Sequence, residues 1–353
     1  MLDIFCNVID NFGDIGFSLR LARDLARHGI TVCLYCDNFD ALNKIETASD
    51  RACTRLKTLP WPDDGGSYEP SCVVIEAFSC RLPQWVLEKA RARGALFIEL
   101  DYLTAEKFAE ECHGLPSSSD GSESYFFFPG FTKKTGGLIC EDSYRQMIAK
   151  SRRFDPGDAE ISASLFCYET ASLEPVLNWL AKSRRKFSFD VYEGKPWKLA
   201  CSIFGKDCGF DGVLSDGSMS FKQIGMSDQE AYDASLLSHG INFVRGEDSI
   251  VRAMLSGRPF LWNIYPQDED AHIAKLDSFF NFARDACGAE LSEPVHKLTL
   301  AYNGKCMPSG DPDDFIATWA RMSSRLSERL LSLTSLTENL ISFIRSHGRD
   351  PAS

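Results

Sequence analysis

The chain has 353 residues, of which 44% are hydrophobic and 25% are charged, and its formal net charge is −12. This length exceeds what one compact core usually serves, so two domains are expected. An acidic chain is poorly suited to binding a nucleic-acid backbone, so no nucleic-acid partner is expected. No apolar run approaches the ~18 residues of a membrane-spanning helix, so no membrane partner is expected. No secretory signal is evident, and we therefore expect a cytoplasmic protein.

The first part of the chain alternates strands with helices. Short apolar runs predict strands at residues 2–9, 30–37, 71–78 and 95–102. Apolar residues spaced three and four apart predict helices at 15–27 and 83–94. Such alternation favours a parallel sheet covered by helices on both faces. A loop rich in Ser, Asp and Gly follows at 117–124, and its composition is typical of disorder.

The same alternation resumes after a stretch of mixed charge at 141–160. Strands are predicted at 163–169, 187–192, 240–244 and 258–265, helices at 173–185, 228–239 and 248–257, and a largely helical tail at 313–347. We therefore predict an N-terminal domain over 1–155, a C-terminal domain over 156–335, and a last helix over 336–353 that could return to the first domain. In open α/β sheets ligands bind beyond the C-terminal strand ends, so the expected site is the cleft between the two domains.

Two aspartates flank the first turn, where residues 10–16 read DNFGDIG. The glycines Gly13 and Gly16 permit a tight turn, and the start of a helix offers N–H groups that favour anions. A purely structural interpretation is that Asp14 caps the helix and Asp10 ends the strand. On motif chemistry alone, this interpretation carries about the same weight as a functional role for the two aspartates.

A second strand-to-helix turn, FVRGEDS at residues 243–249, suits a phosphate at Asp248 and Ser249. The alternative is that one of these two residues is simply a helix cap. Glu247 fits neither reading, because a carboxylate beside a phosphate needs another task, such as accepting from a sugar hydroxyl or a cationic acceptor.

A third segment, WNIYPQDEDAH at 262–272, places Tyr265 and Gln267 just after a predicted strand. A tyrosine there is more often a core residue with its hydroxyl in water than a ligand contact. His272 is more often structural than a catalytic base. Cys33 and Cys36 have the C-x2-C spacing, but no second ligand pair follows, so buried thiols are the better interpretation of the scattered cysteines.

These segments together resemble the EarP family, the protein-arginine rhamnosyltransferases of elongation factor P. The resemblance runs in order along nearly the whole chain through DIFCNVIDNFGDIG, IEAFSCRLP, CHGLP, YFFFPGFTKKTGGL, SLFCYET, NFVRGEDSIVRA and WNIYPQDEDAHIAKLDSF. It implies a GT-B fold of two facing Rossmann-like domains with a helical tail. The implied donor is dTDP-β-L-rhamnose, the acceptor is an arginine of elongation factor P, and the anomeric centre is inverted.

The resemblance also assigns roles to residues. The catalytic carboxylates fall on Asp10, Asp14 and Glu247. The donor contacts fall on a larger set: Asn11, Phe12, Gly13, Tyr168, Tyr265, Gln267, Asp248 and Ser249. No cofactor and no metal are expected, and the D-x-D stretches at 268–270 and 311–313 are interpreted as turns or helix starts.

This assignment explains why two carboxylates stand in the first turn. A guanidinium has a pKa above ~12, so it arrives protonated and is a poor nucleophile. Carboxylates hold it by charge-assisted hydrogen bonds, and one of them accepts a proton as the nitrogen attacks. We predict Asp14 as the base and Asp10 as the residue that orients the arginine, although the sequence alone would also allow the reverse.

Two departures from the family pattern stand out. Residues 223–227 read QIGMS where an aromatic residue for the thymine is expected, so Met226 could take its place, and Asp101 stands where glutamate is usual. The alternative function is a GT-B glycosyltransferase with another nucleotide sugar or acceptor. A third, from another class, is an inactive module that binds elongation factor P, which the joint presence of Asp10, Asp14 and Glu247 disfavours.

Overall fold

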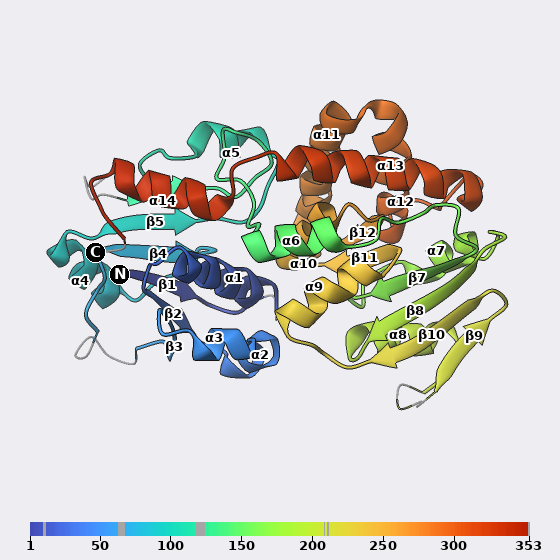
Figure 1. Cartoon of the computed structure of the whole chain (residues 1–353), viewed down its shortest axis with the longest axis horizontal. Coiled ribbons are helices and arrows are strands. Elements are labelled where there is room, and N and C mark those ends of the chain that lie inside the picture. The colour runs from blue at the N-terminus through green and yellow to red at the C-terminus, as the bar shows by residue number, and fades with distance from the viewer. Residues whose placement is uncertain (10–11, 63–67, 118–123, 208, 210–211, 352–353) are drawn as a thin grey trace. The chain divides into compact units, whose positions relative to one another are not determined.

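The structure is a computed structural model that describes residues 1–9, 12–62, 68–117, 124–207, 209 and 212–351 (Figure 1). Most of the Ser-, Asp- and Gly-rich loop at 117–124 therefore lies outside the described residues. The chain divides into two compact units: Met1–Glu141 with Leu333–Ser353, and Asp142–Ser332.

The first unit is built on a parallel sheet in the order β3-β2-β1-β4-β5-β6. Its strands are β1 (Leu2–Cys6), β2 (Val32–Cys36), β3 (Leu56–Pro60), β4 (Val73–Ala77), β5 (Leu96–Leu100) and β6 (Ser124–Phe127). Its helices are α1 (Gly13–Arg27), α2 (Phe39–Ile45), α3 (Ala48–Ala52), α4 (Gln84–Arg93), α5 (Lys107–Cys112) and α14 (Leu336–Ser346). Every residue of β1 is buried, as a central parallel strand requires.

The C-terminal helix α14 belongs to this first unit, among the blue and cyan elements of Figure 1. Its apolar residues Leu340 and Ile344 share a core with Leu19 and Leu25 of α1. The helix begins with a capping box formed by Ser335 and Glu338. The amphipathic pattern of both helices thus covers one face of the sheet, and a second apolar cluster around Phe5 and Val74 covers the other.

The second unit carries a sheet in the order β12-β11-β7-β8-β10-β9, parallel except for the antiparallel pair β9–β10. Its strands are β7 (Glu160–Leu165), β8 (Lys186–Tyr192), β9 (Val213–Asp216), β10 (Met219–Ile224), β11 (Ile241–Arg245) and β12 (Phe260–Asn263). Its helices are α6 (Asp142–Lys150), α7 (Leu173–Leu180), α8 (Lys195–Ile203), α9 (Gln229–Ser238), α10 (Glu247–Ser256), α11 (Ala271–Cys287), α12 (Ala289–Tyr302) and α13 (Pro312–Leu331), with a 3-10 turn η1 (Asp268–Asp270) before α11.

The division between the units falls earlier than the predicted boundary at residue 155, because α6 belongs to the second unit. The hydroxyl of Tyr144 donates to the carbonyl of Arg252 at 2.9 Å, and the Arg252 guanidinium lies 4.4 Å from the centre of the Tyr144 ring. These contacts fasten α6 to α10. The mixed charge of the segment gave no sign of this, because the buried face of α6 rests largely on one tyrosine.

Candidate functional site

The first predicted site residues follow β1, where Asp10 and Asn11 lie outside the described residues. Phe12 is the N-cap of α1 and makes no side-chain cap, Gly13 begins the helix, and Asp14 stands in its first turn. Asp14 is 3% exposed, and its Oδ2 accepts a hydrogen bond from the backbone N–H of Ile9 at 2.9 Å. The structural reading of Asp14 as the helix N-cap is therefore wrong: this bond holds the chain that leaves β1. A carboxylate in the first turn also suits the positive end of the helix.

A strained loop follows β4, the neighbour of β1 in the sheet. Phe78, Ser79 and Arg81 have φ angles of 58°, 49° and 56°, a region that side chains other than glycine rarely adopt. The Glu76 carboxylate accepts from the N–H of Arg81 at 2.7 Å and pins the loop, while burial raises the pKa of that carboxyl. Strain at a ligand-binding strand edge often marks a functional loop. The sequence singled out IEAFSCRLP only through the family resemblance.

In the second unit, Glu247 begins α10 directly after Gly246, whose φ of 65° favours glycine. Gly246 is the N-cap, so the reading of Asp248 or Ser249 as the cap is wrong. The Oε1 of Glu247 lies 2.6 Å from the ammonium nitrogen of Lys275 on α11. Lys275 carries no sequence signal, because it reaches Glu247 only through the packing of α11 on this edge.

The other two residues of this turn make side-chain hydrogen bonds. Asp248 accepts from the amide of Gln229 at 3.3 Å. The buried hydroxyl of Ser249 donates to the carbonyl of Arg245. The group that Ser249 can offer to an anion is therefore its backbone N–H, since first-turn N–H groups have no partner within the helix.

Two tyrosines and an arginine meet at the C-terminal ends of β7, β11 and β12. Tyr168 is buried, Tyr265 is 47% exposed, and their ring centres are 5.4 Å apart at an angle of 82°. The guanidinium of Arg245 lies 4.8 Å from the ring centre of Tyr168 and 4.2 Å from that of Phe166. It also donates to the carbonyl of Cys167 at 3.1 Å. Tyr265 is thus not a core residue, and Arg245, which sequence reasoning missed, is a buried cation beside the predicted donor contacts.

The remaining predicted contacts lie close by in the chain. Gln267 is exposed, and its backbone N–H donates to Nδ1 of the buried His272 at 3.1 Å, a structural role for that histidine. In the segment that departs from the family pattern, Met226 is half-buried, and its backbone N–H donates a hydrogen bond to Oε1 of Glu193 at 3.2 Å. Asp101 follows β5, and its carboxylate accepts from the N–H of Tyr102 at 2.6 Å.

The D-x-D stretch at 311–313 starts a helix, as interpreted from the sequence. Asp311 is the N-cap of α13, while Asp313 accepts from the hydroxyl of Ser183 at 2.5 Å and pairs with Arg185. Over the described parts of the chain, no group of three or more His, Cys, Asp or Glu side chains could hold a metal ion. Cys33 and Cys36 are buried free thiols, and the described helices include none long and apolar enough to cross a membrane.

The comparisons with known proteins bear on both units. The family model for "Elongation-Factor P (EF-P) rhamnosyltransferase EarP" matches residues 2–345. The chain belongs to the EarP family. Protein-arginine rhamnosyltransferase of Pseudomonas putida KT2440 is 38% identical over 324 residues, covering 85% of this chain and 86% of the relative. The enzyme of the same name from Pseudomonas aeruginosa PAO1 is 32% identical over 97% of this chain and 98% of its own.

Solved structures agree on the fold. A structure of EarP, described as the basis of arginine glycosylation of translation elongation factor EF-P, aligns over 98% of both chains with 24% identity and a TM-score of 0.62. The glycosyltransferase VinC in complex with dTDP aligns over 99% of this chain and 100% of its own, with 14% identity and a TM-score of 0.51. This EarP-family chain thus has the predicted GT-B fold, and its enzyme class is protein-arginine rhamnosyltransferase.

Proposed function

We propose that the enzyme transfers L-rhamnose from dTDP-β-L-rhamnose to an arginine side chain of translation elongation factor P, with inversion at the anomeric carbon. The observation that carries this proposal is the group formed by Arg245, Tyr168, Tyr265 and the start of α10, within a chain that belongs to the EarP family. A translation factor as acceptor also implies that the enzyme works in the cytoplasm.

The donor diphosphate is assigned to the second unit. A diphosphate needs positive charge and N–H donors, and both are present where β11 ends. The Arg245 guanidinium is held by Cys167 and by two aromatic rings, so few of its rotamers need to be frozen on binding. The first-turn N–H groups of α10 supply oriented dipoles beside it. These groups stabilise the negative charge that develops on dTDP as it leaves.

The sugar and the aromatic contacts are assigned to neighbouring residues. Tyr265 presents an exposed ring edge-on to Tyr168, which suits a partly apolar deoxysugar. Glu247 stands at the same turn, fixed by Lys275, and is placed to accept from a sugar hydroxyl or from the acceptor guanidinium. Gln267 and the turn residues Asn11, Phe12 and Gly13 complete the donor contacts in this proposal.

The acceptor arginine is assigned to the first unit. Asp10 and Asp14 hold its guanidinium by charge-assisted hydrogen bonds, with Asp14 as general base. The Ile9 N–H fixes one oxygen of Asp14 before any substrate arrives. In the reaction a guanidinium nitrogen forms a bond to the anomeric carbon, the bond from that carbon to the diphosphate oxygen breaks, and the proton lost by nitrogen passes to Asp14. No metal or cofactor takes part in this scheme.

The experiment that tests the proposal is the intact mass of purified elongation factor P after incubation with the enzyme and dTDP-β-L-rhamnose. We expect a gain of one deoxyhexose, mapped to a single arginine. A gain with another nucleotide sugar, or on free arginine or a short peptide alone, would favour the alternative GT-B activity. Tight binding of elongation factor P without any gain, while dTDP still binds in calorimetry, would support the inactive module instead.

A further inference from the structure

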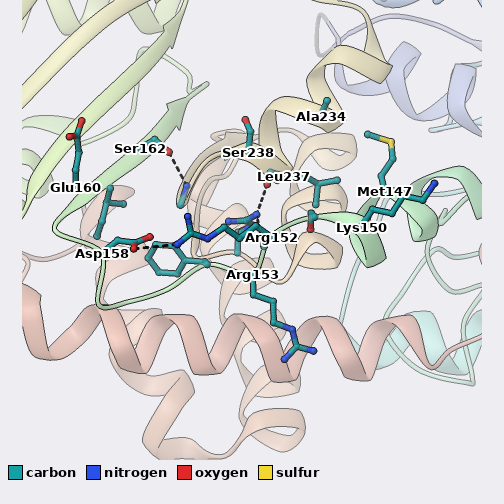
Figure 2. A pocket seen from close by; sticks show the side chains of 15 residues that line it. Met147, Lys150, Arg152, Arg153, Asp158, Glu160, Ser162, Ala234, Leu237 and Ser238 are labelled. Carbon is teal, nitrogen blue, oxygen red and sulfur yellow. Dashed lines mark hydrogen bonds and ion pairs between the residues drawn. The ribbon is translucent and has the colours of Figure 1, made fainter.

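A cavity of about 570 Å³ opens in the second unit, at the edge of the sheet where β7 and β11 begin. Figure 2 shows Met147 and Lys150 on one side of it and Asp158 and Glu160 on the other. The proposed donor contacts lie at the opposite ends of these strands. Because β7 spans Glu160–Leu165, and a strand rises by about 3.3 Å per residue, the two regions are roughly 20 Å apart.

The lining of this cavity is basic in an acidic protein. Its charged side chains are four cations and two anions: Lys150, Arg152, Arg153, Arg258, Asp158 and Glu160. The chain as a whole carries a net charge of −12. Arg152 pairs with Asp158 at 3.6 Å, so the excess of positive charge comes from the other three cations and is met by Glu160 alone.

Arg258 is the residue that distinguishes this cavity from an ordinary basic surface. It is 6% exposed and stands between α10 and β12. Its Nη2 donates to the carbonyls of Leu237, in the last turn of α9, and of Arg152. In the described parts of the chain, Arg258 forms no ion pair with a carboxylate, and its Nε and Nη1 donate to no protein acceptor. Burial, together with the charge of Arg152, lowers the pKa of this guanidinium.

A structural role accounts for only part of this arrangement. The end of α9 carries partial negative charge, so Arg258 acts as a C-terminal cap for that helix. The bonds to Leu237 and Arg152 use the two N–H groups of Nη2, which leaves three of the five N–H donors of the guanidinium. A buried guanidinium without a counter-ion is costly, and an anion at the remaining donors removes the cost.

We propose that this cavity is a binding site for a compact phosphorylated small molecule, separate from the donor site. Its volume lies in the range of small-molecule pockets. The arginine fork matches the geometry of a phosphate group, and Lys150 and Arg153 at the exposed rim add charge. Asp158 and Glu160 on the other wall disfavour an extended acidic peptide, which would bring several carboxylates against them.

The test is calorimetric titration of the full chain with pyrophosphate at constant ionic strength. Because the proposed donor site also offers groups for a diphosphate, saturating dTDP is present to occupy it, and one-site binding of pyrophosphate to the unmodified protein is then expected. The double variant Lys150→Gln with Arg153→Gln should weaken it about tenfold, since two charged contacts are removed while the buried bonds of Arg258 stay intact. The matched control is Lys182→Gln with Lys186→Gln, which removes two exposed charges of the same unit outside the cavity and should leave the affinity unchanged.

Arg245→Gln separates this cavity from the donor site and should retain the pyrophosphate affinity. Loss of binding in Arg245→Gln would place pyrophosphate at the donor site and overturn the proposal. Equal weakening in the control pair would reduce it to non-specific charge attraction. An absence of heat with pyrophosphate, together with binding of an oligoglutamate peptide that the rim variant abolishes, would overturn it in favour of a protein partner.

Discussion

The Oδ2 atom of Asp14 accepts a hydrogen bond from the backbone N–H of Ile9 at 2.9 Å. The next N–H upstream, that of Val8, is bound in the same way by the carboxylate of Asp37, also at 2.9 Å. Two aspartates thus hold the chain that leaves β1, but Asp14 is buried in the first turn of α1 and Asp37 is exposed. Both carboxylates thus accept a hydrogen bond from the backbone after β1, but only Asp14 has a proposed catalytic role.

This pair provides a matched test of the proposed base. Asp14→Asn keeps an oxygen that can accept from Ile9, so the fold and the affinity for dTDP should be retained. Removing a general base should lower kcat by about a hundredfold or more. Single-turnover transfer to elongation factor P, followed by intact mass, measures the rate.

Asp37→Asn is the control, because it alters an equivalent backbone contact without a proposed catalytic role. It should turn over at nearly the normal rate. If the two variants lose activity equally, the loop geometry rather than the carboxylate is what matters, and the assignment of Asp14 as base fails.

The ion pair between Lys275 and Glu247 leads to a second prediction. Lys275→Met removes the ammonium that fixes the Glu247 carboxylate at 2.6 Å. A catalytic group that is displaced by about 1 Å can lose up to a hundredfold in rate, so kcat should fall by about tenfold to a hundredfold while dTDP affinity changes little. Lys275→Arg, which keeps the positive charge, should recover most of the activity.

Lys305→Met is the corresponding control, since it breaks an exposed ion pair with Asp270 in the same unit. Exposed pairs contribute little, so both stability and kcat should be close to normal. A Lys275→Met enzyme with normal kcat would show that Glu247 needs no positioning by this lysine.

Much of the site could be predicted from the sequence, because its turns are local. DNFGDIG and FVRGEDS each join a strand to a helix, and the helix starts at Gly13 and Glu247 lie close to the predicted ones. Lys275 could not be predicted as the partner of Glu247, because that contact depends on how α11 packs. Whether a tyrosine such as Tyr265 is exposed depends in the same way on tertiary structure.

The unpredicted strands β9 and β10 are a different case, because a local signal was available. Gly217 and Ser218 form a dipeptide that is typical of a two-residue hairpin loop, and Asp216 of β9 pairs with Met219 of β10 directly across it. The strand pattern of β9 was not apparent from the sequence because the strand is short and three of its four residues are exposed. An edge strand with little buried surface leaves little hydrophobic periodicity to detect.

The buried cation Arg245, at the proposed donor site, gives a third prediction. Arg245→Lys keeps the charge but loses the flat guanidinium that lies over Phe166 and Tyr168. Charge-assisted hydrogen bonds contribute roughly 1.5–3 kcal/mol each, so dTDP affinity should fall by at least about tenfold. Calorimetry with dTDP measures it, and Arg284→Lys, an exposed arginine of the same unit, should bind dTDP normally. Unchanged affinity in Arg245→Lys would remove Arg245 from the donor site.

His113 gives the last prediction, on pH and stability. Its Nδ1 accepts from the backbone N–H of Phe128 at 3.0 Å, which requires a neutral ring with an unprotonated Nδ1, and burial lowers the pKa of this histidine below its usual 6.5. Between the lowered folded pKa and the ordinary unfolded one, the unfolded chain binds more protons than the folded chain. Stability should therefore fall as pH drops below about 6.5 and level off below the folded pKa.

His113→Asn tests this origin, because it offers an amide oxygen to Phe128 and does not titrate. This part of the pH dependence, measured by urea unfolding, should disappear in the variant. The control His28→Asn, which replaces a partly exposed histidine, should keep it. A pH profile of His113→Asn that parallels the unmodified protein would mean that another group titrates in this window.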